Sequence, residues 1–362
     1  MNQNKIENVI AEFALVGALK SCTPYGSGHI NDTYLVDMQQ KRYILQKINT
    51  HVFSNAKALM QNISQITQFL KQKIVEAGGD PYRETLNLVP TQQGTYYFQD
   101  HDHCFWRCYD FIEDSISYDI VRAPEDFYQC GIAFGHFQSL LADFPAKILF
   151  ETIPNFHNTP LRYQTFLQAV SADSHQRADE ASEEISFIRQ RAGELSELTY
   201  SLKQGKLPLR VTHNDTKLNN CLFDRRSRKA ICVIDLDTVM PGLVAYDFGD
   251  SIRFGASTAA EDEPDLKKVH FSLPLYESYT KGFLEAAGKS LTSEELCSLP
   301  VGAKLMTLEC GIRFLTDYLE GDVYFKISHE KHNLERCRTQ LKLVSEMESK
   351  WNEMNDIIYK YK

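Results

Sequence analysis

The sequence predicts an α+β fold made of two unequal lobes, a small β-rich lobe and a larger, mainly helical one. Short apolar runs bounded by turn residues dominate the first 112 residues, whereas apolar positions at helical spacing dominate the remainder. The length of 362 residues is enough for two lobes. We therefore expect a first lobe over residues 1–112, built as a five-stranded sheet with a helix, and a second lobe over residues 113–362.

The elements of the first lobe follow from the period of its apolar residues. A short amphipathic helix is predicted over 5–19 and a longer helix over 55–76, whose apolar residues at helical spacing are Leu59, Ile63, Ile66, Phe69, Leu70 and Ile74. Strands are predicted over 20–25, 33–38, 42–48, 95–99 and 104–111. A short connector near residues 110–116 would then lead into the second lobe.

The second lobe reads as helices interrupted once by strands. Helices are predicted over 124–142, through most of 162–203, and again through 265–362. The charged segment 173–184 fits a solvated face or a loop better than a site. Strands return only within 209–237, where two apolar runs flank a polar turn and so predict a β-hairpin.

Composition limits the classes of function. The chain is 43% hydrophobic and 24% charged, and its formal net charge of −9 argues against nucleic acid or anionic membranes as partners. No apolar run of about 18 residues occurs, and the first twelve residues lack the apolar core of a signal peptide. The nine cysteines are scattered without zinc-type spacing, which fits reduced thiols. We therefore expect a cytoplasmic protein.

The most informative residues for chemistry lie between positions 213 and 250. The acid of His213-Asn214-Asp215 is followed five residues later by Asn220, and Asp235 ends an apolar strand. Phosphoryl transfer from ATP needs this set: one carboxylate receives or orients the attacking hydroxyl, and an Asn and an Asp hold Mg²⁺ against the phosphates. Asp215 is thus the candidate to contact the acceptor hydroxyl. Lys217 could neutralise the transferring phosphoryl group.

The predicted hairpin suggests how the metal ligands meet. A turn centred near Ser227–Arg228 leaves Asn220 and Asp235 equally distant from it, so they should lie opposite one another on the two strands. Two hard oxygen ligands, completed by water and phosphate oxygens, suit magnesium rather than zinc. His213 more plausibly supports the loop by hydrogen bonds than acts as a base, because Asp215 already fills that role.

These segments resemble a known family. The stretches 211–220, 232–242 and 246–253 are similar to the catalytic segments of the aminoglycoside phosphotransferase and choline kinase superfamily, which is related to protein kinases. They resemble the N-acetylhexosamine 1-kinases more closely still, and segments 28–34 and 156–160 extend the resemblance over nearly the whole chain. The resemblance implies a bilobal protein-kinase-like fold. It also implies ATP-dependent phosphorylation of the anomeric hydroxyl of N-acetylglucosamine or N-acetylgalactosamine, as in amino-sugar salvage.

The resemblance also assigns roles to the acids. It makes Asp215 the catalytic base and makes Asn220 and Asp235 the Mg²⁺ ligands. The stretch Asp247-Phe248-Gly249 spells the metal motif of protein kinases, yet the resemblance makes Asp247 a support for the catalytic loop. Asp237 is a weaker candidate for a second metal contact or a substrate contact.

Residues for nucleotide binding are expected in the first lobe. Gly26 and Gly28 could let a loop fold over the phosphates, or they could form an ordinary hairpin turn. Lys47 ends the third strand, where kinases keep the lysine that holds the α- and β-phosphates, although an edge-strand lysine is the alternative. Residues 54–75 contain no acid to pair with this lysine, so Asn62 or Gln65 could substitute, or Lys47 could be held in another way.

Other contacts are placed by analogy. His29 and Asn31 could donate hydrogen bonds to phosphates or to the sugar, and we include His29 among the substrate-binding candidates. The connector residues Phe111 and Glu113 should offer backbone groups to adenine.

The acceptor side is expected in the helices. Arg313 and Asp317 lie four residues apart on one helix face, which fits either an ion pair or a sugar-binding arginine in a cleft. The resemblance favours Arg313 as a sugar ligand. Tyr324 could pack on the acceptor, or it could equally belong to the core.

Two other functions remain open at this point. One is a related kinase that acts on choline, homoserine or an aminoglycoside, and an arginine in the cleft would disfavour such cationic acceptors. The other is a non-catalytic nucleotide-binding module, which the intact Asp215, Asn220 and Asp235 argue against. We expect ATP, Mg²⁺ and a small-molecule sugar as ligands, and a monomer or a weak homodimer.

Overall fold

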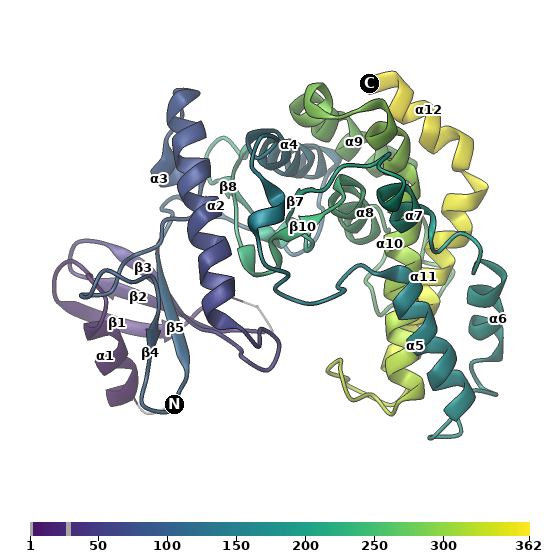
Figure 1. Cartoon of the computed structure of the whole chain (residues 1–362), viewed down its shortest axis with the longest axis horizontal. Helices are drawn as coiled ribbons and strands as arrows, with labels where there is room; N and C mark the ends of the chain where they lie inside the picture. The colour runs from purple at the N-terminus through teal and green to yellow at the C-terminus, as the bar shows by residue number, and fades with distance from the viewer. Residues whose placement is uncertain (1–2, 27–29) are drawn as a thin grey trace. The chain divides into compact units, whose positions relative to one another are not determined.

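The α+β class is confirmed by a computed structural model that describes residues 3–26 and 30–362. The chain forms two compact units (Figure 1). The first comprises Met1–Ile116, Asp143–Pro154 and Leu222–Met240, and the second comprises Ser117–Ala142, Asn155–Cys221 and Pro241–Lys362. The boundary predicted at residue 112 therefore lies close to the end of the first segment, but two later segments also belong to the first unit.

An antiparallel five-stranded sheet is the centre of the first unit, as the sequence predicted. Its strand order is β1-β2-β3-β5-β4, and the sheet is visible as a group of adjacent arrows in Figure 1. The strands are β1 (Leu19–Pro24), β2 (Asp32–Met38), β3 (Arg42–Lys47), β4 (Phe98–Gln99) and β5 (Phe105–Asp110).

Two helices accompany this sheet. Helix α1 (Gln3–Ala11) packs Ile6, Val9 and Ile10 onto a core that includes Val36, Leu45 and Trp106. The predicted helix 5–19 was wrong beyond Ala11, because Phe13 bridges to Thr91 and the N–H of Ala14 donates to the carbonyl of Pro90. Helix α2 (Ala56–Glu76) matches its prediction and starts at Asn55, whose side chain accepts from the N–H of Ala58.

Shorter elements complete the first unit. Helix α3 (Pro81–Glu84) follows α2, and a three-stranded sheet has the order β6-β8-β9. These strands are β6 (Ser115–Ile116), β8 (Cys221–Asp224) and β9 (Ala230–Val233). The predicted hairpin is therefore present as β8 and β9.

The second unit is mainly helical. Its helices are α4 (Pro124–Leu140), α5 (Thr159–Ala172), α6 (Ser182–Gln190), α7 (Glu197–Lys203), α8 (Val244–Gly255), α9 (Leu273–Ala287), α10 (Ser293–Leu319), α11 (His332–Ser349) and α12 (Trp351–Tyr361). Strands β7 (Arg210–Thr212) and β10 (Met240–Gly242) form a two-stranded sheet. Among the described residues no helix is long and apolar enough to cross a lipid bilayer.

Helix α10 lies at the centre of the second unit, since its apolar residues pack with those of α5, α6, α8 and α11 in one core. The crossing of α8 and α10 depends on two glycines. A Cβ on Gly249 would lie 2.3 Å from the carbonyl oxygen of Gly302, and one on Gly302 would lie 2.1 Å from that of Ala245. No side chain fits at these distances, so only glycine lets the two helix backbones come this close. This close packing fixes the position of α8.

Candidate active site

Asp215 lies on a loop that follows strand β7 in the second unit. Its carboxylate Oδ1 lies 2.7 Å from the ammonium of Lys217, and its Oδ2 accepts from the amide nitrogen of Asn220 at 3.0 Å. The side chain of Asp215 is 26% exposed, so it can still reach a ligand. Burial by itself raises the pKa of this carboxyl, but the Lys217 charge and the hydrogen bonds outweigh it and leave the pKa below its ordinary value. Asp215 is therefore an ionised, accessible carboxylate.

Helix α8 holds this loop in place. The Asp247 carboxylate accepts from the backbone N–H groups of His213 at 2.9 Å and Asn214 at 2.7 Å, and from the Gln138 amide at 2.6 Å. Asp247 is completely buried, and burial raises its pKa despite these donors. Asp247 thus supports the loop that carries Asp215, as the resemblance implied. In the same stretch, Phe248 belongs to the helix core and Gly249 to the α10 crossing.

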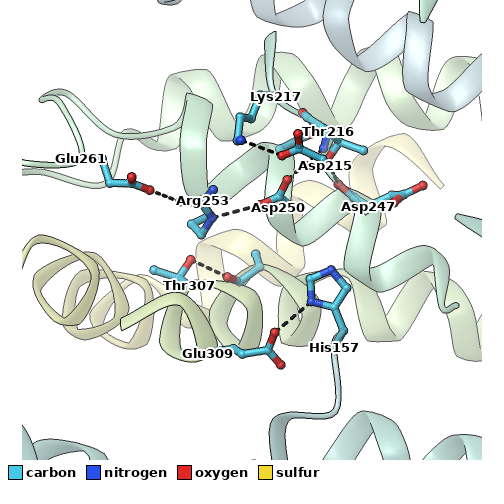
Figure 2. Close-up of polar contacts among 12 residues, drawn as sticks. His157, Asp215, Thr216, Lys217, Asp247, Asp250, Arg253, Glu261, Thr307 and Glu309 are labelled. Carbon is cyan, nitrogen blue, oxygen red and sulfur yellow. Dashed lines mark hydrogen bonds and ion pairs between the residues drawn. The ribbon is translucent and has the colours of Figure 1, made fainter. Parts of the chain in front are cut away.

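A second acid of α8 extends the support. The Asp250 carboxylate accepts from the N–H of Thr216 at 2.9 Å and from Arg253 Nε at 3.0 Å, and Arg253 Nη1 reaches Glu261 at 2.5 Å (Figure 2). Arg253 and Glu261 also line a cavity of about 380 Å³ in the second unit. The chain of contacts from Glu261 to Thr216 therefore runs from this cavity to the residue that follows Asp215.

The hydrogen bond expected of His213 is also present. Its Nδ1 accepts from the N–H of Asp215 at 3.3 Å, and its buried ring packs edge-on against Phe134 and Phe137. These contacts fit a residue that shapes the loop rather than one that exchanges protons.

Asn220 fits the chemistry of a magnesium ligand. Its amide nitrogen donates to the carbonyl oxygen of Asp215 at 2.8 Å and to the carboxylate at 3.0 Å, so both N–H bonds are used. The remaining side-chain atom is Oδ1, a hard oxygen donor of the kind that Mg²⁺ prefers. No cluster of three or more His, Cys, Asp or Glu side chains within the described residues could hold a metal alone. The binding of Mg²⁺ at Asn220 stays a prediction.

The hairpin argument for pairing Asn220 with Asp235 was wrong in its mechanism. Strand β8 begins only at Cys221 and β9 ends at Val233, so both residues lie outside the paired strands. The N–H of Asp224 donates to the carbonyl of Lys229 at 2.8 Å, which centres the tip one residue before the predicted position. Asn220 instead ends a short 3₁₀ turn, Leu218–Asn220, in the second unit. Asp235 belongs to the first unit, with a left-handed φ of 58°.

Asp237 and Asn31 make structural contacts in the first unit, and the ligand roles considered for them stay predictions. Asp237 Oδ1 pairs with the guanidinium of Arg107, and both side chains are almost completely buried. The other oxygen, Oδ2, accepts from Asn31 Nδ2 at 2.7 Å, and Asn31 Oδ1 accepts from the N–H of Asn49 at 2.9 Å. Both oxygens of Asp237 are therefore engaged in a buried ion pair and its supporting hydrogen bond.

Asn62 does not replace the missing glutamate partner of Lys47. Its amide nitrogen donates to the carbonyls of Phe150 at 2.8 Å and Val239 at 3.1 Å, and its oxygen accepts from the N–H of Phe150 at 3.0 Å. Asn62 thus joins α2 to the two later segments of the first unit. Lys47 lies at the end of β3 opposite Trp106 of β5, and among the described residues it forms no ion pair. Its contact with nucleotide phosphates stays a prediction.

The remaining nucleotide-binding candidates are placed only in part. Gly26 has a positive φ of 80°, which suits a glycine turn, whereas Gly28 and His29 lie outside the described residues. The N–H of Phe111 donates to the carbonyl of Arg42 at 3.0 Å, and the carbonyl of Glu113 accepts from Arg83 at 2.7 Å. These two backbone groups already have partners, and adenine recognition by the other groups of this connector stays a prediction.

On the acceptor side, Arg313 and Asp317 do not form an ion pair. Asp317 accepts from the N–H groups of Tyr324 at 2.7 Å and Phe325 at 2.9 Å, and so fixes the turn after α10. The guanidinium of Arg313 lies 5.5 Å from the ring of Phe156, 5.9 Å from that of Tyr324 and 5.4 Å from that of Phe325. Tyr324 is 63% exposed, which excludes the core role considered for it.

Several site residues were not found from the sequence. Gln138 lies in an apolar helical segment that reads as core, and Asp250 and Arg253 lie in the resembling segment 246–253, where only Asp247 was given a role. Glu309 is similar: it is buried in α10, where its carboxylate accepts from His157 Nδ1 at 2.9 Å and from the Thr159 hydroxyl at 2.6 Å. A polar residue within an apolar helix face must find partners when it is buried, and this rule was the available signal.

The fold and the loop geometry define the chain as a kinase-like phosphotransferase of small molecules. Residues 21–280, well over half of the chain, match the model of the phosphotransferase enzyme family known as APH, so the chain belongs to this family.

Solved structures agree at the level of the fold. An aminoglycoside phosphotransferase from Alicyclobacillus acidocaldarius is similar with a TM-score of 0.64 and 12% identity, covering 98% of this chain and 96% of that one. A choline kinase from Cryptosporidium parvum has a TM-score of 0.58 and 13% identity, with 98% and 97% covered. A spectinomycin phosphotransferase in complex with ADP and spectinomycin has a TM-score of 0.55 and 12% identity, with 100% and 98% covered.

Proposed function

We propose that this protein transfers the γ-phosphoryl group of ATP to the anomeric hydroxyl of N-acetylglucosamine or N-acetylgalactosamine, forming the sugar 1-phosphate. The observation that carries the proposal is the state of Asp215, an ionised and accessible carboxylate on a loop held by Asp247 and Asp250. A rigid loop keeps the carboxylate in place for the acceptor hydroxyl, and such positioning is most of what phosphoryl transfer asks of a protein.

The low pKa of Asp215 is consistent with this role. A weak base suffices when the transition state is loose and the attacking hydroxyl is anomeric, because such a hydroxyl is more acidic than that of an ordinary alcohol. In our proposal Asp215 orients the hydroxyl and takes its proton, and Lys217 lies 2.7 Å away to offset negative charge on the phosphoryl group. Asn220 and Asp235 would hold Mg²⁺, which neutralises charge on the phosphates when it is bound.

Arg313 supports a neutral sugar as the acceptor. Its guanidinium is surrounded by aromatic rings and forms no ion pair among the described residues, so its N–H groups are available to hydroxyl or carbonyl oxygens. The acceptors named for the similar structures, choline and spectinomycin, keep a related kinase as the competing proposal. A cationic acceptor would be repelled by Arg313 unless acids surrounded it.

The test is ADP release, measured by a coupled assay with ATP and Mg²⁺ over N-acetylglucosamine, N-acetylgalactosamine, choline, homoserine and an aminoglycoside. We expect turnover with the N-acetylated sugars. Asp215→Asn should lower kcat by about 10³-fold or more while the protein stays folded, because the variant keeps the size of the side chain but loses its basicity. Turnover of choline alone would replace the sugar assignment, and a wild-type rate in Asp215→Asn would remove Asp215 from the chemistry.

A further inference from the structure

The surroundings of Glu309 contain more unused hydrogen-bonding capacity than a purely structural cluster needs. Glu309 is buried in α10, and two groups near the start of α5 contact it, namely His157 Nδ1 and the hydroxyl of Thr159. In Figure 2 the His157–Glu309 pair is drawn apart from the chain of contacts that leads to Asp215. The far nitrogen of His157, Nε2, is buried and has no hydrogen-bond partner. Such an orphan atom in a native protein calls for water or a ligand.

Arg162 has the same property. Its guanidinium donates from Nη2 to the carbonyl of Phe156 at 3.2 Å, but its Nε–H is buried without a partner. Burial lowers the pKa of Arg162, and the neighbouring charge of Arg313 lowers it further. Arg162 therefore lies within electrostatic range of a second cationic side chain, Arg313, although like charges repel.

The charges around these arginines do not balance. Glu309 is ionised: burial alone would raise its pKa, but His157, Thr159 and Arg313 lower it below the ordinary value. One carboxylate thus faces two guanidinium groups, and neither Arg162 nor Arg313 forms an ion pair with it. The cluster is consequently rich in N–H donors and positive in charge, with aromatic walls from Phe156 and Tyr324.

We propose that Arg162 is a second acceptor-recognition residue, which together with Arg313 binds the oxygen atoms of an uncharged acylamino sugar and excludes acceptors that carry an ammonium group. The inference rests on the proposed sugar kinase activity. It adds Arg162 as a binding residue and a physical reason why acceptors with an ammonium group are rejected. An acylamino group suits the cluster, since its carbonyl oxygen accepts from Arg162 Nε–H, and the unpartnered Nε2 of His157, whose Nδ1 contacts Glu309, offers a second polar contact. A protonated amine at the same position offers only donors and adds a third positive charge.

The experiment compares N-acetylglucosamine with glucosamine, at a pH where glucosamine is largely protonated, in the wild type, Arg162→Gln, Arg162→Lys and Arg189→Gln. Arg189 is an exposed arginine of α6 and serves as the matched control. Arg162→Gln should raise KM for N-acetylglucosamine by about 10-fold or more with little change in kcat, because it removes a charge-assisted hydrogen bond that does not touch the reacting oxygen. Arg162→Gln should also reduce the ratio of kcat/KM for N-acetylglucosamine to kcat/KM for glucosamine by about 10-fold. Arg189→Gln should change neither quantity.

The two arginine variants separate charge from geometry. Arg162→Lys keeps the positive charge and so should still reject glucosamine, but it loses the Nε–H and should raise KM for N-acetylglucosamine. If Arg162→Gln fails to fold, this KM effect in Arg162→Lys decides the matter. Unchanged KM and unchanged preference in a variant that phosphorylates N-acetylglucosamine would overturn the role of Arg162 while leaving the proposed function intact. No turnover of N-acetylglucosamine by the wild type would instead overturn the proposed function.

Discussion

Asp215 and Lys217 show how one pair of neighbours sets the chemistry of a residue. Both side chains keep part of their surface exposed, 26% for Asp215 and 35% for Lys217, and they lie 2.7 Å apart. The ammonium holds the pKa of the carboxyl below its ordinary value in spite of burial. Asp215 thus stays ionised at any pH at which the protein is expected to work, and protonation of this acid should not limit activity near neutrality.

Lys217→Met tests this electrostatic pairing through stability rather than rate. A carboxyl with a depressed folded pKa stabilises the protein above its unfolded pKa of about 3.9, and that contribution disappears as the pH falls through the folded pKa. The variant should therefore lose about 0.5–1 kcal/mol of unfolding free energy at pH 7, a partly exposed pair being worth no more. The loss should shrink below about pH 4. Urea unfolding across this pH range measures it.

The control for this comparison is Lys206→Met, which replaces an exposed lysine in the loop before β7. Its stability difference from the wild type should be within about 0.5 kcal/mol at every pH. A Lys217→Met deficit that is the same at pH 7 and pH 3 would mean that packing, and not the charge of Asp215, accounts for it.

At the level of elements, helix α8 positions the loop that carries Asp215. Its acids Asp247 and Asp250 accept the loop N–H groups, while Gly249 brings the helix close to α10. Helix α10 thus fixes the position of α8, and α8 in turn fixes the loop that carries Asp215. The Asp247-Phe248-Gly249 stretch is conspicuous in the sequence for its likeness to a metal motif, but here all three residues serve packing and loop support.

Gly302→Ala should disturb this arrangement. The new Cβ would lie 2.1 Å from the carbonyl oxygen of Ala245, and backbone atoms cannot yield as the end of a side chain can. We expect a loss of about 1–3 kcal/mol of unfolding free energy, with a fall in kcat as α8 shifts. Gly193→Ala is the matched control, since nothing lies within 4 Å of its added Cβ. Equal stability of the two variants would show that α8 and α10 can separate without cost.

At the level of the whole molecule, the two compact units are not consecutive pieces of chain. The first unit draws on segments 143–154 and 222–240 in addition to residues up to 116. Asn62 bonds to Phe150 and Val239, and Arg107 pairs with Asp237, so the first segment depends on the later ones for its buried polar contacts.

A fragment of residues 1–116 should therefore fail to fold alone. It retains the five-stranded sheet but leaves Arg107 buried without Asp237, and an unpaired buried charge of this kind costs about 3–5 kcal/mol. We expect no cooperative thermal transition by circular dichroism, whereas the full chain should show one. A fragment that melts cooperatively would mean that the first segment is an independent domain.

The sequence predicted most of the elements and the loop on which Asp215 and Asn220 lie, but not the contacts that join distant segments. The strands of the first sheet and α2 were found because their apolar period is local information. Asp215 and Asn220 were found because they lie five residues apart on one loop. The Asn62 and Asp237 partnerships were misjudged, since a polar residue can satisfy itself with any buried group and the sequence does not say which. Residues 12–19 were predicted as helix because nothing local showed that Phe13 forms a bridge to Thr91 instead.

The interleaved order of the two units also constrains how the protein is made. A ribosome synthesises the chain from the N-terminus, and domains that consist of one continuous segment can fold as soon as they emerge. Here the partners of Asn62 and Arg107 include Val239 and Asp237, so the first unit stays incomplete until the chain has been synthesised as far as Val239. Until then Arg107 has no counter-ion and the first segment stays unfolded, so the growing polypeptide should depend on chaperones at that stage.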